Sequence, residues 1–243
     1  MKKVIVVGAT SGIGREVARL MLQKGWLLGI AGRRKDLLEE LREEYPENVV
    51  VYPIDVMKND AAERLRHLIE LRGGMDLFFL ASGMGRQNPS LDEDIEIRTA
   101  ETNVSGFIRV MTSAYNYFKA KNEGHIAVIS SIAGTKGLGA APSYSATKQF
   151  QTTYIDALAQ LSRMQETNIR FTDIRPGFVD TALLDSEAHR YPMLMSPAKV
   201  ATAIMRAIEK KKRVTIIDWR YSILVFLWKL LPGFIWERTK IKN

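Results

Sequence analysis

Near its start the chain carries the stretch Val4-Ile5-Val6-Val7-Gly8-Ala9-Thr10-Ser11-Gly12-Ile13-Gly14, an apolar run that leads into three glycines. The run predicts a buried strand, and the glycines predict a tight turn into a helix. Such a turn lets the backbone approach a pyrophosphate, whose charge is favoured at a helix N-terminus. An ordinary strand-to-helix turn has a similar composition, but the position directly after the first strand favours a phosphate site. Its predicted members are Gly8, Thr10, Ser11, Gly12, Ile13 and Gly14.

Short apolar runs alternate with helical patterns along the rest of the chain. The predicted strands lie near residues 3–7, 26–31, 49–54, 75–80, 125–130, 169–174 and 214–217, and the helices near 12–24, 35–44, 58–71, 99–121, 144–165 and 197–210. The strand runs are continuously apolar, as expected when both faces of a sheet are covered. We therefore predict an α/β fold of Rossmann type, a doubly wound parallel sheet of about seven strands with helices on both faces. Residues 1–218 are expected to form one domain.

The composition restricts the class of protein. The chain has 243 residues, a formal net charge of +8 and no cysteine. The lack of cysteine excludes disulfides and thiolate metal sites and favours a reducing, cytoplasmic compartment. The three histidines have no ligand-like spacing, so we expect no metal. Basic residues are spread along the chain except at 210–213, which favours a solvated basic surface over nucleic-acid binding.

Two arginines after the second predicted strand, Arg33 and Arg34, indicate which dinucleotide fits the phosphate site. A site for NAD usually carries Asp or Glu here, whereas arginine accommodates the 2′-phosphate of NADP. A guanidinium pairs with phosphate through two parallel hydrogen bonds. The alternative is a pair of solvated arginines at a helix start. We predict NADP(H) as the cofactor. Further contacts with it are expected after the third and fourth strands, from Asp55, Val56, Ala81, Ser82 and Gly83.

Several short motifs follow one another in a fixed order. They are Gly8 to Gly14, Asp55-Val56, Asn103-Val104-Ser105-Gly106, Ser130-Ser131, Tyr144-Ser145-Ala146-Thr147-Lys148 and Pro176-Gly177. Together they resemble the short-chain dehydrogenase/reductase family, in its shorter-subunit form, over about residues 3–217. A tyrosine and a lysine at this spacing occur by chance in many proteins, but the ordered set makes coincidence implausible. The resemblance implies an oxidoreductase that transfers a hydride between NADP(H) and a carbonyl or alcohol substrate.

The resemblance implies that Tyr144 is the general acid and base. A phenol with a pKa near 10 is a poor proton donor or acceptor at neutral pH unless its pKa falls. Lys148, at i+4, lies on the same helix face, and its charge favours the phenolate and thus a lower tyrosine pKa. By resemblance Lys148 also hydrogen-bonds the nicotinamide ribose, so both residues are counted among the cofactor contacts.

The remaining catalytic and cofactor residues follow from the same resemblance. Ser131 lies thirteen residues before Tyr144, the spacing of the family's catalytic serine, whereas Ser130 is expected to pack at the strand end. The Ser131 hydroxyl would donate to a developing oxyanion. Asn103 matches the asparagine that holds a water in a proton relay behind the lysine; the alternative is a polar residue turned outward on a long helix. The implied nicotinamide contacts are Pro176, Gly177, Val179 and Thr181.

Residues 219–243 form an apolar C-terminal extension that does not fit the family pattern. The part from Trp219 to Trp236 holds three of the four tryptophans and has basic residues on both sides. It is too short and too interrupted to span a bilayer. It could pack on the domain over the substrate pocket, against a partner subunit, or peripherally on the inner face of a membrane. We also expect a homodimer or homotetramer.

Two functions from different classes are consistent with these residues. One is an enzyme, and the other is a nucleotide-sensing regulatory protein that keeps the fold without turnover. The complete set of Asn103, Ser131, Tyr144 and Lys148 favours the enzyme, because a sensor would not need all four. Substrate specificity is expected from residues 182–196 and from the extension. Both segments are rich in apolar side chains, which favours a hydrophobic substrate.

Overall fold

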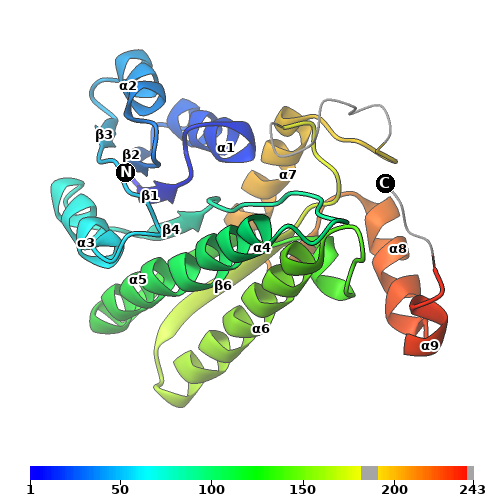
Figure 1. Cartoon of the computed structure of the whole chain (residues 1–243). Coiled ribbons are helices and arrows are strands. Elements are labelled where there is room, and N and C mark those ends of the chain that lie inside the picture. The colour runs from blue at the N-terminus through cyan, green and yellow to red at the C-terminus, as the bar shows by residue number, and fades with distance from the viewer. Residues whose placement is uncertain (182–190, 240–243) are drawn as a thin grey trace.

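A seven-stranded parallel sheet forms the centre of the molecule (Figure 1). The computed structural model describes residues 1–181 and 191–239. The strand order is β3-β2-β1-β4-β5-β6-β7, and each neighbouring pair is parallel. The strands are β1 (Lys3–Val7), β2 (Leu27–Ala31), β3 (Val49–Val51), β4 (Leu77–Leu80), β5 (Glu123–Ile129), β6 (Asn168–Arg175) and β7 (Val214–Ile216). The predicted doubly wound α/β fold is confirmed.

Helices cover both faces of this sheet. The main ones are α1 (Gly12–Gln23), α2 (Lys35–Glu44), α3 (Ala61–Leu71), α5 (Phe107–Lys121), α6 (Pro142–Met164) and α7 (Pro197–Glu209). Figure 1 shows α1, α2 and α7 on one side and α3, α5 and α6 on the other. On β1, Val4 and Val6 join the core on the α1 side, whereas Ile5 and Val7 join the core on the α3 side. The positions from Val4 to Val7 are therefore all apolar because both faces of the strand are buried.

The strand order reverses beside β1, which lies between β2 and β4. In open α/β sheets ligands bind outside the carboxyl ends of the strands at such a switch point. The turn that follows β1 leads directly into α1, with Ser11 as the residue before the helix. The predicted phosphate site thus lies at the edge of the sheet where a ligand is expected.

The helix predicted over 99–121 begins earlier and contains a wider turn. It consists of α4 (Glu93–Ala100), a π-helical segment η1 (Glu101–Gly106) and then α5. Asp92 caps α4 by accepting a hydrogen bond from the Ile95 N–H at 3.3 Å. The apolar pattern missed α4 because Thr99 is its only buried residue. π-Helical turns are frequent at functional sites, and η1 contains Asn103.

The C-terminal extension forms two helices, α8 (Trp219–Leu230) and α9 (Gly233–Trp236). Tyr221 and Val225 are buried in the core on the α7 side of the sheet. The Tyr221 hydroxyl accepts from the Phe178 N–H at 3.1 Å and donates to the Pro192 carbonyl at 2.9 Å. The extension is thus tied to the segments that follow β6. Within residues 1–181 and 191–239, no helix is long and apolar enough to cross a membrane. Of the predicted specificity segment 182–196, residues 182–190 lie outside the described part.

Candidate active site

The glycine-rich turn after β1 forms a backbone cradle at the start of α1. Gly8 has a φ of +99°, and a Cβ on it would lie 2.4 Å from Ser82 N. A Cβ on Gly14 would lie 2.0 Å from the Gly8 carbonyl oxygen. Only glycine allows these approaches, and the left-handed φ of Gly8 is also unfavourable for other residues. The cradle fits a pyrophosphate, since it combines exposed backbone with the positive end of a helix.

Arg34 lies against this turn. Its Nη2 donates to Thr10 Oγ1 at 3.0 Å and to Ser11 Oγ at 2.8 Å. Arg33 is exposed beside it, at the end of the loop after β2. Of the two predicted arginines, Arg34 is therefore the one that the structure brings to the phosphate cradle. Its guanidinium stands at the edge of the turn with further donors available to an anion.

Two other predicted cofactor contacts connect the cradle to the catalytic residues. A Cβ on Gly12 would lie 3.2 Å from Thr181 Cγ2, so the segment after β6 reaches the phosphate turn. A Cβ on Gly83 would lie 3.4 Å from both Asn103 Oδ1 and Lys148 Nζ. Gly83 thus occupies the place where the end of β4 meets the lysine. The glycine turn and the predicted catalytic residues thus lie next to each other at one edge of the sheet.

The remaining predicted contacts lie at the carboxyl edge of the sheet. Asp55 accepts a hydrogen bond from the Met57 N–H at 3.1 Å, which turns the chain after β3. A Cβ on Gly177 would lie 2.2 Å from the ring of Tyr221, so α8 packs directly under this glycine. Val179 is buried and forms an isolated parallel bridge with a residue of the segment before α7. The other predicted residues follow β3, β4 and β6 at this edge: Val56, Ala81, Ser82 and Pro176.

Tyr144 and Lys148 lie together on the first turns of α6. Lys148 Nζ is 5.8 Å from the centroid of the Tyr144 ring. The ring packs against Gly85, where a Cβ would lie 2.6 Å from ring atom Cε2. The Ser131 side chain lies close enough to the Tyr144 hydroxyl to lower its pKa. The three predicted catalytic side chains therefore form one cluster, with the lysine buried behind the phenol.

The two neighbouring serines after β5 have different surroundings. Ser131 Oγ accepts from the Ala133 N–H at 3.1 Å and contacts the Tyr144 hydroxyl. Ser130 instead hydrogen-bonds the buried carboxylate of Asp173 on β6. Ser130 thus holds two strands together, whereas Ser131 faces the tyrosine. The expected distinction between the two serines agrees with this placement.

Burial controls the protonation of the cluster. Burial raises the pKa of Tyr144 above its usual value, and the hydrogen bond with Ser131 partly opposes this rise. Burial lowers the pKa of Lys148 to about 8, against the attraction of Asp173. The sequence predicted a lowered Tyr144 pKa from the Lys148 charge alone. The direction is the opposite in the structure, because desolvation disfavours the phenolate. The phenol is thus protonated at neutral pH, as a proton donor must be.

Asn103 is buried and fixed through both its side chain and its backbone. Its Nδ2 donates to the Met84 carbonyl at 2.6 Å, and its Oδ1 accepts from the Met84 N–H at 2.8 Å. Nδ2 also donates to Thr147 Oγ1 at 3.1 Å. The side chain therefore anchors η1 to the segment after β4 and to α6. The Asn103 backbone carbonyl accepts a hydrogen bond from Gln151 Nε2 at 2.9 Å.

Gln151 is a buried polar residue that the sequence analysis missed. Its Oε1 accepts from Lys148 Nζ at 2.9 Å, while its Nε2 donates to the Asn103 carbonyl. Its position three residues after Lys148 places it on the same helix face, which was the available signal. A glutamine on a helix is more often solvated, and only its burial, with 1% of its surface exposed, distinguishes the two cases.

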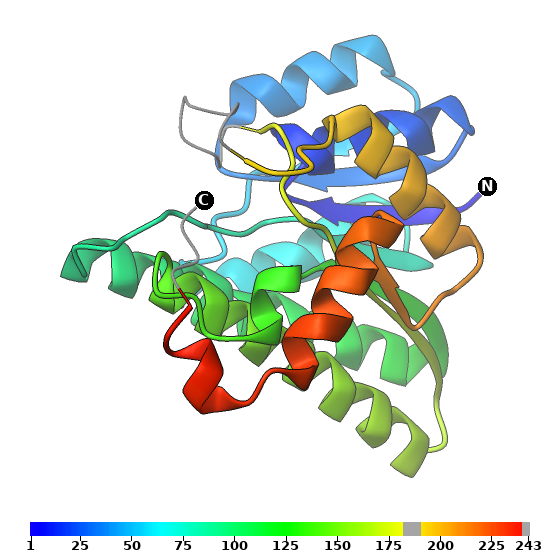
Figure 2. The ribbon, with the colours of Figure 1, turned by 90° about the vertical axis from the view of Figure 1, so that its right-hand side faces the viewer.

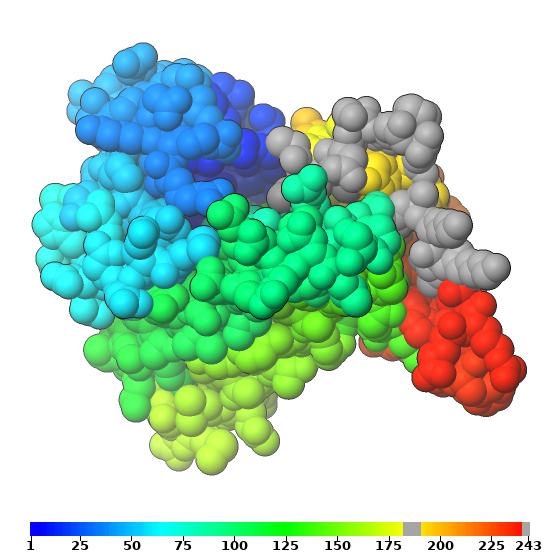
Figure 3. Space-filling view, viewed as in Figure 1, coloured from blue at the N-terminus to red at the C-terminus, as the bar shows by residue number. Residues whose placement is uncertain are grey.

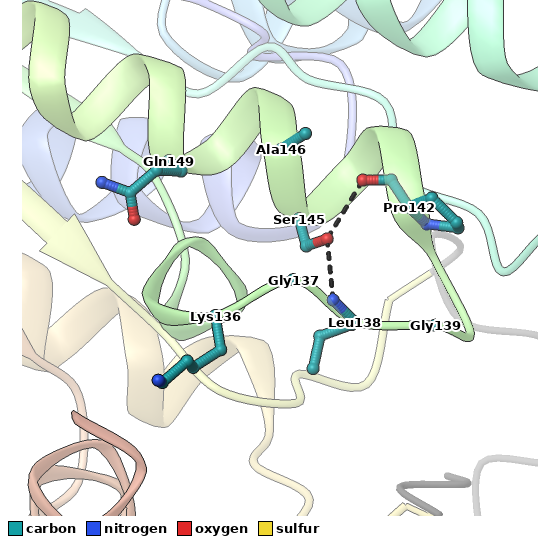
Figure 4. A pocket seen from close by; sticks show the side chains of 8 residues that line it. All are labelled: Lys136, Gly137, Leu138, Gly139, Pro142, Ser145, Ala146 and Gln149. Carbon is teal, nitrogen blue, oxygen red and sulfur yellow. Dashed lines mark hydrogen bonds between the residues drawn. The ribbon is translucent and has the colours of Figure 1, made fainter. Parts of the chain in front are cut away.

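A surface pocket of about 440 Å³ lies beside α6 (Figure 4). Its lining consists of Lys136, Gly137, Leu138, Gly139, Pro142, Ser145, Ala146 and Gln149. Ser145 Oγ accepts from the Leu138 N–H at 3.0 Å and donates to the Pro142 carbonyl at 3.0 Å, which fixes the loop on the helix start. Neither Tyr144 nor Lys148 lines the pocket. It therefore flanks the catalytic cluster rather than containing it.

Two sequence relatives cover nearly the whole chain. An uncharacterized oxidoreductase of Myxococcus xanthus is 30% identical over 239 residues, which cover 96% of this chain and 94% of the relative. Dehydrogenase/reductase SDR family member 7B of Bos taurus is 28% identical over 258 residues, which cover 96% of this chain and 79% of the relative. The family pattern described as short chain dehydrogenase matches residues 2–192.

Solved structures with bound cofactor share the fold. The closed form of serine dehydrogenase complexed with NADP⁺ superposes with a TM-score of 0.76 at 25% identity, over 84% of this chain and 88% of that one. ElxO with NADP bound gives a TM-score of 0.80 at 21% identity, over 91% of this chain and 99% of that one. These structural neighbours are complexed with NADP(H). Because the family pattern spans most of the sequence, the protein belongs to the short-chain dehydrogenase/reductase family of oxidoreductases.

Proposed function

We propose that this protein transfers a hydride between NADP(H) and a carbonyl or alcohol substrate, with Tyr144 as the general acid and base. The observation that carries the proposal is the cluster of Ser131, Tyr144 and Lys148, two neighbouring hydroxyls in front of a buried ammonium. A carbonyl that receives a hydride develops negative charge on its oxygen and needs a proton there. In this cluster Ser131 can donate a hydrogen bond to the charged oxygen, and Tyr144 can donate the proton.

The residues around the glycine turn fit NADP(H). A Cβ on Gly8 or Gly14 would collide with backbone atoms, so glycine keeps this turn tight, and Arg34 stands at the edge of the same turn. The pyrophosphate would lie on the backbone of this turn, and the 2′-phosphate would pair with Arg34. When bound, the cofactor supplies or accepts the hydride. The NADP-bound forms of serine dehydrogenase and ElxO support the same choice of cofactor.

Each catalytic residue has a separate task in this proposal. Ser131 donates a hydrogen bond to the substrate oxygen and orients it toward Tyr144. Tyr144 donates its phenolic proton to that oxygen during reduction and takes it back during alcohol oxidation. Lys148 stabilises the phenolate that Tyr144 leaves behind, because a buried cation favours the charged form of a neighbouring acid. Burial of the lysine excludes water that would weaken this attraction.

A screen of NADPH oxidation over carbonyl compounds graded by size and polarity tests the proposal. We expect NADPH-dependent reduction of apolar ketones or aldehydes, with much slower oxidation of NADH. NADPH binding without oxidation of the cofactor by any compound in the set would favour the nucleotide-sensing alternative. A hydrophobic substrate is supported by the rings of Phe178, within the proposed nicotinamide segment, and Tyr191, whose centroids lie 4.9 Å apart.

The choice of NADP over NAD predicts a selective effect at Arg34. Substitution Arg34→Ala is expected to weaken NADPH binding by about tenfold to a hundredfold, the range for loss of hydrogen bonds to a charged group. NADH binding should change little, because NADH lacks the 2′-phosphate. Fluorescence titration with both cofactors measures the effect. Arg42→Ala on α2 is the matched control, since its side chain pairs with Glu39 on the same helix. Equal losses for the two cofactors, or no loss, would contradict the assignment.

We also propose that the enzyme is cytoplasmic and forms a homodimer or homotetramer. Light scattering during size-exclusion chromatography measures the assembly directly. A monomer at micromolar concentration would contradict this part of the proposal without affecting the proposed chemistry. The C-terminal extension leaves part of its apolar surface exposed on this chain. That surface remains available to a partner subunit or to a membrane.

A further inference from the structure

One side of α8 carries exposed apolar side chains that continue onto α9. This C-terminal apolar face consists of Trp219, Ile223, Phe226, Leu227, Leu230 and Phe234. Their exposed fractions run from 52% for Ile223 to 71% for Trp219. On α8 the members recur at the spacing that places side chains on one side of a helix. Figure 3 shows the end of this segment, in red, projecting from the body of the molecule.

The opposite side of the extension is firmly attached to the domain. Tyr221 and Val225 of α8 are buried in the core. Lys136 Nζ donates to the Leu231 carbonyl at 2.9 Å, and Trp236 Nε1 donates to a carbonyl of the same loop, at Gly137, at 2.8 Å. The extension is therefore already packed on the domain through its other side, and the exposed face is a fixed part of the surface. A contiguous apolar surface of this kind indicates an interaction site.

Basic groups border the C-terminal apolar face. Lys229 flanks it at the end of α8, and Arg238 follows α9 beside Glu237, while Arg220 stands at the start of α8. Asp218, at the start of α8, is already paired with Arg220 at 2.8 Å. A two-fold contact between copies would bring these cations together, whereas an anionic surface neutralises them. The charge around the face thus favours an anionic lipid surface over a second copy of the chain.

The two helices that carry the C-terminal apolar face lie beside the loop that leads into α6 (Figure 2). The loop that Leu231 and Trp236 contact connects the segment of Ser131 to the start of α6, which carries Tyr144. On its other side α8 contacts Phe178 through the Tyr221 hydroxyl. The extension therefore joins both segments that border the catalytic cluster.

We propose that the C-terminal apolar face docks in the interface of an anionic membrane, so that the active site receives a carbonyl-bearing lipid from that membrane. The aromatic and aliphatic side chains would insert among the acyl chains near the headgroups, while the basic border pairs with lipid phosphates. The lipid class of the substrate rests on the proposed reductase function. The docking itself rests only on the face and its charges.

Co-sedimentation with vesicles tests the docking. Wild-type protein is expected to sediment with vesicles of phosphatidylcholine and phosphatidylglycerol at 3:1, and far less with phosphatidylcholine alone or at high salt, since salt screens the basic border. Phe226→Glu with Leu230→Glu should lower the bound fraction by about tenfold or more, because charge enters the interface. Met164→Glu, at an exposed apolar position far along α6, is the control and should bind as wild type does.

Light scattering and activity on a water-soluble carbonyl complete the test. The double variant should keep the oligomeric state and this activity, which separates loss of docking from loss of the proposed function. Failure of the wild type to bind anionic vesicles, or equal binding by the double variant, would overturn the proposal. So would a change from dimer to monomer in the double variant, because a second copy would then be the occupant.

A second, independent inference concerns Gln151. Its amide connects the ammonium of Lys148 to the backbone carbonyl of Asn103, with both distances 2.9 Å. Because one end must accept and the other must donate, these two partners fix the orientation of the amide. Lys148 Nζ also donates to the Ile129 carbonyl at 3.1 Å. These contacts engage two of its three donors and leave the ammonium in one defined position.

We infer that Gln151 is a positioning residue, which occupies the place between Lys148 and Asn103 where the family pattern implies a water. An amide holds its hydrogens more firmly than water does, so it orients the lysine without passing protons along. The proton that Tyr144 gains or loses would then be exchanged with solvent on the substrate side of the site. The ionisable groups near the lysine are Tyr144 on α6 and Asp173 on β6, which is paired with Arg175.

The pH dependence of kcat/KM separates positioning from packing. Gln151→Leu removes a hydrogen-bond acceptor from the Lys148 ammonium and so disfavours its charged form. We expect the limb of the pH profile that reports the Lys148 pKa to move to lower pH, and kcat to fall about tenfold. Gln151→Glu adds a negative charge and should move the same limb to higher pH. Gln149→Leu, an exposed neighbour on the same helix, should leave the profile unchanged. Superimposable profiles for wild type and a folded Gln151→Leu or Gln151→Glu variant would overturn the inference.

Discussion

Replacing Tyr144 by phenylalanine is expected to lower kcat by about a thousandfold while leaving NADPH binding nearly unchanged. General acid catalysis contributes about a hundredfold to ten-thousandfold, and Tyr144 is the only hydroxyl in the cluster that combines contact with Ser131 and proximity to a buried ammonium within the described residues. Phenylalanine keeps the ring that packs against Gly85. The fold and the cofactor cradle should therefore survive the change.

Stopped-flow kinetics with NADPH, together with a fluorescence titration, measure both parts of this prediction. Tyr154→Phe is the matched control on the same helix, because it removes a phenol that bonds Thr112 Oγ1 at 3.3 Å outside the cluster. The control should retain activity within about threefold, the scale of one weak hydrogen bond. Wild-type turnover by Tyr144→Phe on the true substrate would contradict the assigned role. A parallel loss of NADPH binding would instead point to a binding role.

The second large effect is expected at Gly14. An alanine Cβ here would lie 2.0 Å from the carbonyl oxygen of Gly8, a backbone atom that cannot turn away. The turn must shift, and we expect NADPH binding to weaken by at least about a hundredfold because the backbone cradle is displaced. Overpacking of this kind also costs about 1–3 kcal/mol of stability.

Fluorescence titration and thermal unfolding in the presence and absence of NADPH measure this effect. Gly139→Ala is the control, since a Cβ there meets no heavy atom within 4 Å. The control should bind NADPH as tightly as the wild type does. Unchanged NADPH affinity in Gly14→Ala would show that the turn after β1 is not the pyrophosphate site.

The strands were predictable because the sheet is buried on both faces. The apolar residues from Val4 to Val7 face two separate cores, so no alternation obscured the strand. Helix boundaries were less accurate where their signals are local and polar. Pro142 at the start of α6 and Asp92 before α4 both begin helices ahead of the predicted positions. The apolar pattern does not register either residue.

Ordered motifs in the sequence pointed to the side chains of the candidate site, but not to their electrostatics. The charge of Lys148 suggested a lowered Tyr144 pKa, whereas burial raises that pKa in the folded chain. Burial depends on segments distant in sequence, such as the one that brings Gly85 to the ring. Gln151 was missed for the same reason, because nothing in its local sequence distinguishes a buried glutamine from a solvated one. The extension was recognised as apolar, but only the fold distinguishes its buried side at Tyr221 from its exposed one.

Transfer of a labelled hydride tests the central claim most directly. NADPH that carries deuterium at both C4 positions is mixed with the best carbonyl from the screen, and the alcohol is analysed by mass spectrometry. The account predicts one deuterium on the carbinol carbon with wild-type protein, and formation of this alcohol about a thousandfold slower with Tyr144→Phe. Alcohol without the label, or labelled alcohol formed by Tyr144→Phe at the wild-type rate, would contradict it.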